Sequence, residues 1–166
     1  MFFKKTVQDI MIPIENYTVI PIDKSLREAI IAMRKVYCEV ETGKCTEAGH
    51  RASLVMNEYG HLSGIIDFRT ILETLIPNIA EQFADKLTSH GKASFMERTL
   101  KEAEVRVGDI MLDIRGSLNV DDDLLESLKV MHRYKATVLP VYKDDKLVGV
   151  LRESDLFLAV ASVFTD

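Results

Sequence analysis

The chain has 166 residues, 47% of them hydrophobic and 28% charged, which is the composition of an ordinary globular protein. Its formal net charge is −5 and its basic residues are scattered, so we expect no nucleic-acid partner. The longest apolar stretch, Leu156 to Phe164, is far shorter than the roughly 20 residues that span a bilayer, and the N-terminus lacks the apolar region of a signal peptide. We therefore expect a cytoplasmic protein that is not an integral membrane protein.

The N-terminal part predicts a short leading segment and then a strand. Val7 to Met11 has little periodicity, and we expect Ile10 and Met11 to pack on the core before Pro13 ends the segment. Tyr17 to Ile22 alternates in the manner of a short strand.

A helix is predicted after this strand. Ser25 and Glu28 have the spacing of a capping box, and the helix should run to about Val36. Apolar residues recur at helical spacing and predict one buried stripe, formed by Leu26, Ala29, Ile30 and Met33.

The residues near 37–50 form an insertion that the second half of the chain lacks. They include Cys38, Cys45 and His50, and His61 from a later turn is a fourth candidate metal ligand. Structural zinc sites usually space their ligands more closely than this. Two interpretations stay open, a metal site and an acidic loop that carries two thiols, and the loop could also contact a partner.

A hairpin and a helix complete the first half. Arg51 to Met56 and Leu62 to Ile66 are predicted strands around the turn Asn57 to Gly60. Phe68 to Ile76 is predicted as a helix that Pro77 stops. Its apolar face would consist of Ile71, Leu72 and Leu75.

The connection from 77 to 106 is predicted to be a helical linker. Gly91 should separate two helical stretches, and Ser94 can cap the second of them. The apolar stripes of these helices either pack on the core or take part in a dimer contact.

The second half predicts the same elements again. Asp123 and Glu126 stand where Ser25 and Glu28 form the capping box of the first half. The buried stripe of the helix that they begin would be Leu124, Leu128 and Met131. Two β-branched runs, Thr137 to Tyr142 and Leu147 to Leu151, flank a polar turn. The last helix, Leu156 to Phe164, is apolar nearly all round, so we expect it to be buried in the molecule or between subunits.

Three blocks of sequence recur in one order. Val7-Gln8-Asp9-Ile10-Met11 returns as Val107-Gly108-Asp109-Ile110-Met111. The block at Ile22 to Glu28 returns at Val120 to Glu126, and the first hairpin returns as the second. The chain is therefore an internal duplication.

The duplicated pattern resembles a tandem pair of CBS domains (a Bateman module). The shared features are D-I-M, a strand, a capped helix, a hairpin whose first strand reads h-P-V, where h is apolar, and G-h-h-x-x-x-D before a second helix. The resemblance implies an α/β (α+β) fold of two pseudo-symmetric β-α-β-β-α repeats packed through their sheets. We expect repeat 1 at 1–76, the linker at 77–106 and repeat 2 at 107–166, in a free-standing module that forms a homodimer.

The resemblance also implies a ligand site in the second repeat. There the Asp of G-h-h-(T/S)-x-x-D would hold a ribose diol, and the h-P-V strand would contact the base. The implied residues are Asp155, the nearby hydroxyl of Ser154, and the strand residues Thr137, Val138, Leu139 and Pro140. Arg152 departs from the family pattern, because Thr or Ser is usual there; it could approach a phosphate or fill the cleft. A plain N-cap role for Asp155 stays open beside ligand binding.

The first repeat departs further from the pattern. Thr70 stands where the ribose Asp is expected, and Asp67 stands at the hydroxyl position. We therefore expect at most one good nucleotide site per chain. Additional phosphate contacts could come from basic side chains whose plainer interpretation is a solvated surface charge, namely Arg69, His132, Arg133 and Lys135.

The resemblance implies a regulatory sensor that binds an adenosine-containing ligand resembling AMP, ADP or ATP and signals to an unknown effector protein. The alternatives are an interaction scaffold with decayed ligand sites and a metal-responsive module that uses the insertion. We expect no enzyme and no obligatory cofactor, because the sequence has neither a nucleophile and base pattern nor a P-loop or dinucleotide fingerprint.

Overall fold

The computed structural model describes residues 4–37, 50–76 and 89–165, and leaves the side chains of residues 37 and 89–95 undescribed. Its two compact units are Thr18–Asp113, called here the first-repeat unit, and Met1–Tyr17 with Ile114–Asp166, called the second-repeat unit.

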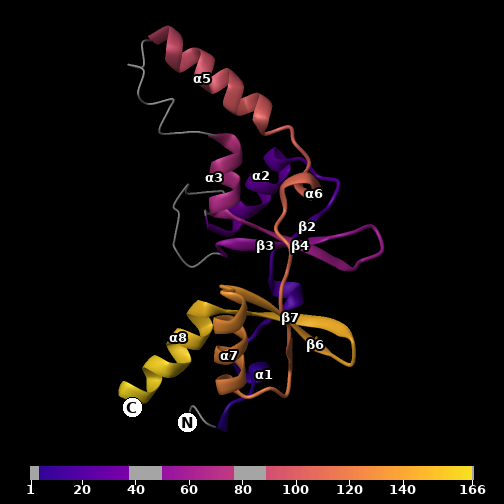
Figure 1. Ribbon diagram of the computed structural model, residues 1–166, viewed down its shortest axis with the longest axis vertical. Coiled ribbons are helices and arrows are strands. Elements are labelled where there is room, and N and C mark those ends of the chain that lie inside the picture. Colours follow the sequence, from indigo (N-terminus) through magenta and orange to yellow (C-terminus); the bar gives the residue numbers. More distant parts are fainter. Residues whose placement is uncertain (1–3, 38–49, 77–88, 166) are drawn as a thin grey trace. The chain divides into compact units, whose positions relative to one another are not determined.

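The first-repeat unit follows the order β-α-β-β-α. These elements are β2 (Val19–Pro21), α2 (Leu26–Tyr37), β3 (Ala52–Met56), β4 (Leu62–Asp67) and α3 (Phe68–Leu75). Strand β3 lies at the centre of the sheet, parallel to β2 and antiparallel to β4. The unit continues with α5 (Ser89–Glu102) and α6 (Val107–Ile110) (Figure 1).

The second-repeat unit repeats this order. Its elements are β5 (Leu118–Asn119), α7 (Leu124–Tyr134), β6 (Val138–Lys143), β7 (Lys146–Arg152) and α8 (Glu153–Ala161), and the short 3-10 helix η3 (Ser162–Phe164) ends it. The N-terminus adds α1 (Val7–Ile10), β1 (Ile12–Pro13) and the 3-10 helix η2 (Ile14–Asn16). The sheet order is β1-β7-β6-β5, with β5 parallel to β6 and β1 antiparallel to β7. The mixed α/β fold and its two repeats are as the sequence predicts.

Each Asp-Ile-Met segment packs on the repeat to which it does not belong in sequence. The N–H of Val7 donates to the carbonyl of Asp122 over 2.9 Å in the second-repeat unit. The N–H of Val107 donates to the carbonyl of Lys24 over 2.8 Å in the first-repeat unit. The compact units therefore differ from the contiguous repeats 1–76 and 107–166 in their leading segments.

The two glycines of the repeated G-h-h motif lie directly under these crossing segments. A Cβ added to Gly149 would be 2.7 Å from both the carbonyl oxygen of Ile12 and the Sδ of Met11. A Cβ on Gly64 would likewise be 2.6 Å from Met111 Sδ and within 2.8 Å of a main-chain oxygen. Backbone approaches backbone too closely here for any side chain, which explains why glycine recurs in this motif.

Each unit has its own hydrophobic core. The core of the second-repeat unit is formed by Val7 together with residues of α7, α8 and the strands. Figure 1 shows α7 and α8 beside the β6–β7 hairpin. Leu124 and Met131 of the predicted stripe are buried, but the prediction for Leu128 is wrong because this side chain is exposed. Ser127 and Val130 are buried instead, so the buried face of α7 extends from the line of Leu124 and Met131 toward these two residues and away from Leu128.

The predicted start of α2 is confirmed atom by atom. The N–H of Ser25 donates to Glu28 Oε2 over 2.9 Å, and the N–H of Glu28 donates to Ser25 Oγ over 3.2 Å. The hydrogen bond from the Ser25 N–H holds the pKa of the Glu28 carboxyl below its ordinary value. In α7 the Glu126 N–H donates to Asp123 Oδ1 over 2.7 Å, the first half of the same arrangement.

Three further predictions about helices need correction. Gly91 does not separate two stretches, because α5 runs without a break from Ser89 to Glu102. The last helix begins earlier than predicted, at Glu153, and within the chain it is buried on one side only: Leu156 is buried, whereas Phe157 and Leu158 are exposed. Leu72 of α3 is also exposed, although it was predicted on the apolar face.

Candidate functional site

The predicted ligand site lies where β7 ends and α8 begins. Val138 of β6 pairs with Arg152 of β7, and the N–H of Glu153 donates to the carbonyl of Thr137 over 2.8 Å. This bond ties the first residue of α8 to the start of β6. The h-P-V strand and the helix carrying Ser154 and Asp155 are thereby brought together within one unit.

Asp155 forms a bidentate ion pair with Arg152. The Nη2 of Arg152 lies 2.7 Å from Asp155 Oδ1, and its Nε donates to Oδ2 over 3.0 Å. The backbone N–H of Arg152 donates to the same Oδ2 over 3.0 Å. Both carboxylate oxygens therefore accept hydrogen bonds from one residue, and Asp155 also closes the N-terminus of α8.

This ion pair is only partly accessible to water. The side chain of Asp155 is 10% exposed and that of Arg152 is 23% exposed. Partial removal from water strengthens the attraction between the charges and also raises the cost of leaving either one unpaired. Breaking this ion pair should therefore cost more free energy than breaking an ordinary surface salt bridge.

The remaining predicted contacts differ in how far a ligand could reach them. Thr137 and Ser154 are exposed and Val138 is half-buried. Leu139 and Pro140 are buried, so their side chains are turned into the protein. A ligand at this place could touch the strand through Thr137, through Val138 or through main-chain atoms.

The predicted phosphate contacts of the second repeat lie at the end of α7. His132 and Arg133 occupy its last turn, and Lys135 follows as the C-cap with a left-handed φ of 51°. All three are exposed. Cations are stabilised at a helix C-terminus by the free carbonyls, so their placement has a structural explanation without any ligand.

The corresponding place in the first repeat is occupied by a helix cap. Asp67 accepts a hydrogen bond over 2.8 Å from the N–H of Thr70, which stands where Asp155 stands in the second repeat. Arg69 is exposed. No carboxylate is thus present at the position that would hold a ribose.

Sequence reasoning missed Ser53, which lies on β3 at the position equivalent to Val138. Its side chain is fully buried, and its hydroxyl has no hydrogen-bond partner in the described part of the chain. A serine inside the apolar run Ala52 to Met56 was the available signal. A buried hydroxyl without a partner carries a free-energy cost.

Comparison with known proteins identifies the family. Residues 7–77 and 107–162 match the sequence profile of the CBS domain. The chain belongs to the CBS domain family. Its two matched segments make it a tandem CBS pair, and such pairs are generally regulatory rather than catalytic. No protein among the curated ones matches the chain.

Solved CBS structures share its fold at low sequence identity. The CBS domain of a CBS-domain-containing membrane protein from Sphaerobacter thermophilus is 19% identical with a TM-score of 0.68, and the match covers 95% of this chain and 89% of that one. CBSX2 in complex with AMP is 18% identical with a TM-score of 0.65, covering 96% and 98%. Hypoxic Response Protein I with two coordinated zinc ions is 19% identical with a TM-score of 0.59, covering 93% and 98%.

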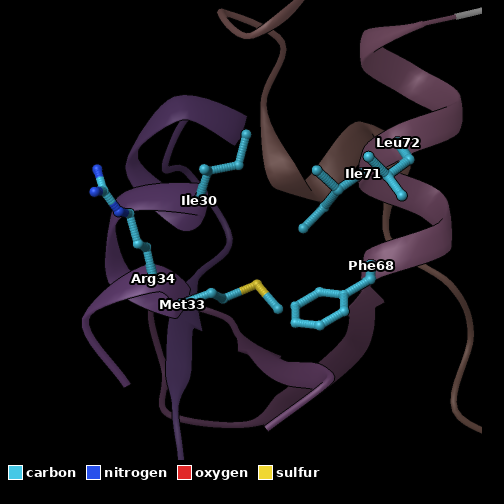
Figure 2. Close-up of a pocket in the computed structure, with 6 residues that line it drawn as sticks. All are labelled: Ile30, Met33, Arg34, Phe68, Ile71 and Leu72. Carbon is cyan, nitrogen blue, oxygen red and sulfur yellow. The ribbon is translucent and has the colours of Figure 1, made fainter. Parts of the chain in front are cut away.

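An apolar hollow lies in the first CBS repeat, between α2 and α3. Its volume is about 400 Å³. Figure 2 shows Met33 of α2 and Phe68 of α3 pointing toward each other across it. The lining is apolar apart from Arg34, and it consists of Ile30, Met33, Arg34, Phe68, Ile71 and Leu72.

The predicted metal ligands do not assemble a site in the described residues. Cys38 and Cys45 lie outside those residues. Within 4–37, 50–76 and 89–165, no group of three or more His, Cys, Asp or Glu side chains could hold a metal ion. His50 is half-buried, and His61 is exposed with its ring centroid 6.5 Å from that of Tyr59.

None of the helices described has both the length and the hydropathy needed to cross a bilayer.

Proposed function

We propose that this CBS pair is a regulatory module that binds an adenosine-containing ligand in its second repeat and signals its presence to a partner protein. The observation that carries the proposal is the carboxylate of Asp155. It is held at the start of α8, beside the exposed residues Thr137 and Ser154. The AMP complex of CBSX2, a protein of the same fold, supports the choice of ligand class.

The chemistry of the site suits a nucleoside. A carboxylate has two acceptor oxygens, so one Asp155 side chain can accept from both hydroxyls of a ribose cis-diol. Main-chain atoms near Val138 can contact the base, and the hydroxyl of Ser154 can donate to a phosphate. In the first repeat Thr70 stands at the position of Asp155 and supplies no carboxylate, so we expect at most one nucleotide per chain.

The second candidate is a dimerisation scaffold whose ligand sites have decayed. It is favoured by the ion pair, because Arg152 already occupies both oxygens of Asp155. It is also favoured by apolar side chains near the C-terminus: Phe157 is 67% exposed and Leu158 is 64% exposed. Exposed side chains of this size are the kind that a homodimer buries.

A thermal-unfolding screen separates the two candidates. The wild type, Asp155→Ala and Asp67→Ala would each be heated with AMP, ADP, ATP, S-adenosylmethionine and NAD. A ligand at 100 times its Kd should add about 2.7 kcal/mol, a rise in Tm of roughly 5 to 10 °C for a chain of this size. The rise should vanish in Asp155→Ala and persist in Asp67→Ala, which removes the equivalent cap carboxylate of the first repeat.

Circular dichroism and sizing of each variant serve as controls for folding and assembly. A wild type that is folded and dimeric, yet unshifted by every ligand of the screen, would overturn the sensor and leave the scaffold. A shift that survives in Asp155→Ala would move the ligand away from the second repeat.

A further inference from the structure

We infer that the apolar hollow between α2 and α3 binds a single-chain amphiphile with an anionic head, such as the anion of a fatty acid. The alkyl chain would lie inside the hollow and the head beside Arg34. All residues that line the hollow belong to the first-repeat unit, and none of them takes part in the proposed nucleoside site at Asp155. The inference therefore does not depend on the proposed function.

The interior of the hollow suits an alkyl chain. Its volume of about 400 Å³ falls within the roughly 300 to 1,000 Å³ of small-molecule pockets. Ile30 and Met33 of α2 face Phe68 and Ile71 of α3 across it (Figure 2). None of the described side chains that line it presents a polar atom to its interior. A polar group inside would lose its hydrogen bonds with water and gain none, so the buried part of a ligand must be apolar.

Arg34 supplies a positive charge at the edge of the hollow. Its side chain is exposed, and Figure 2 shows the guanidinium turned away from the space between Met33 and Phe68. The ion pairs of the described residues do not include Arg34. The long stem of an arginine lets the guanidinium swing to the mouth, so it can pair there with a carboxylate that stays in contact with water.

The second repeat lacks this combination of an apolar wall and a cation. Glu153 directly follows β7, as Phe68 directly follows β4. An acidic side chain thus stands where the first repeat has the phenylalanine that lines the hollow. A carboxylate at this place is unsuited to an apolar space and repels an anionic head. We therefore expect one amphiphile per chain.

Calorimetric titration of the full chain with octanoate, decanoate and dodecanoate, each below its critical micelle concentration, tests the site of the tail. Two added methylene groups should tighten binding about 10-fold until the hollow is full. Leu72→Asp places a carboxylate in the lining and should weaken decanoate binding at least 10-fold. Leu125→Asp makes the same change on α7 and should leave the affinity unchanged. The two leucines are matched in exposure, at 55% and 52%, so neither substitution disturbs a core.

Arg34→Gln tests the site of the head. Decanoate should bind this variant about 2- to 5-fold more weakly than the wild type, the loss expected of an exposed charge pair. Decyltrimethylammonium, which carries the opposite charge, should bind it more tightly, and the neutral 1-decanol should bind both proteins equally. Lys35→Gln removes an exposed charge of α2 that does not line the hollow, and it should change none of the three affinities.

Four outcomes would overturn the inference. One is that none of the three acids binds the wild type, and another is that Leu72→Asp and Leu125→Asp weaken decanoate binding equally. A wild type that binds no decanoate, and that is dimeric until Leu72→Asp makes it monomeric, would show that a second copy fills the hollow. Binding to vesicles of phosphatidylglycerol without binding of free decanoate would assign the hollow to a membrane surface instead.

Discussion

The ion pair between Arg152 and Asp155 should stabilise the folded chain more than a surface salt bridge does. The chain provides its own control, because Arg27 and Glu104 form a pair with the same closest separation, 2.7 Å. The two pairs differ in solvent exposure. Arg27 and Glu104 are 48% and 60% exposed, against 23% and 10% for Arg152 and Asp155.

The difference in exposure fixes the expected magnitudes. Exposed pairs usually show a coupling free energy of roughly 0.2 to 1 kcal/mol. Breaking a fully buried pair costs about 3 to 5 kcal/mol. The partly buried pair of Arg152 and Asp155 should lie between these limits, with a coupling free energy of about 1 to 2 kcal/mol.

Two double-mutant cycles measured by urea unfolding provide the assay. One cycle combines Arg152→Ala with Asp155→Ala, and the other combines Arg27→Ala with Glu104→Ala. At 1 M salt the Debye length is about 3 Å, so the exposed pair should lose its coupling while the partly buried pair retains most of its own. Equal coupling free energies in the two cycles, or the loss of both in salt, would refute the argument from burial.

Two further predictions concern buried positions within the units, one a glycine under a leading segment and the other a pair of serines. Gly149→Ala should destabilise the chain by about 1 to 3 kcal/mol, and adding Met11→Ala should not restore the loss, because the Ile12 carbonyl still lies 2.7 Å from the new Cβ. Recovery of stability in the double variant would place the conflict in the side chain instead of the backbone. Ser53→Ala should leave the free energy of unfolding unchanged or raise it by about 1 kcal/mol, whereas Ser127→Ala should lower it by a similar amount. Among the described residues the Ser127 hydroxyl has a partner, the Asp123 carbonyl at 3.0 Å, and the Ser53 hydroxyl has none. Equal effects of the two serine substitutions in urea unfolding would contradict this reasoning.

Local features of the fold were predictable from the sequence. Ser25 and Glu28 are three residues apart, so their reciprocal hydrogen bonds depend only on the helix geometry between them. Both hairpins also follow from short apolar runs around polar turns. Such features require no knowledge of distant parts of the chain.

Features that depend on neighbours were harder to predict. Arg152 and Asp155 were both named as ligand contacts, yet their three-residue spacing across a helix start already allowed them to bind each other. The exposure of Leu128 and the burial of Ser127 depend on which face of α7 meets the sheet. That the Ser53 hydroxyl finds no partner within residues 4–37, 50–76 and 89–165 depends on tertiary packing, which periodicity does not encode.

The exchange of leading segments has a consequence for the order in which the protein can fold during synthesis. The first-repeat unit is contiguous and has all of its residues once Asp113 has left the ribosome. The second-repeat unit cannot close then, because Val7 must wait for core partners as late in the chain as Leu156. Bringing these distant parts together requires closure of a loop that spans most of the chain, which is the slow kind of contact in folding. The first residues to be made are therefore among the last to reach their final place.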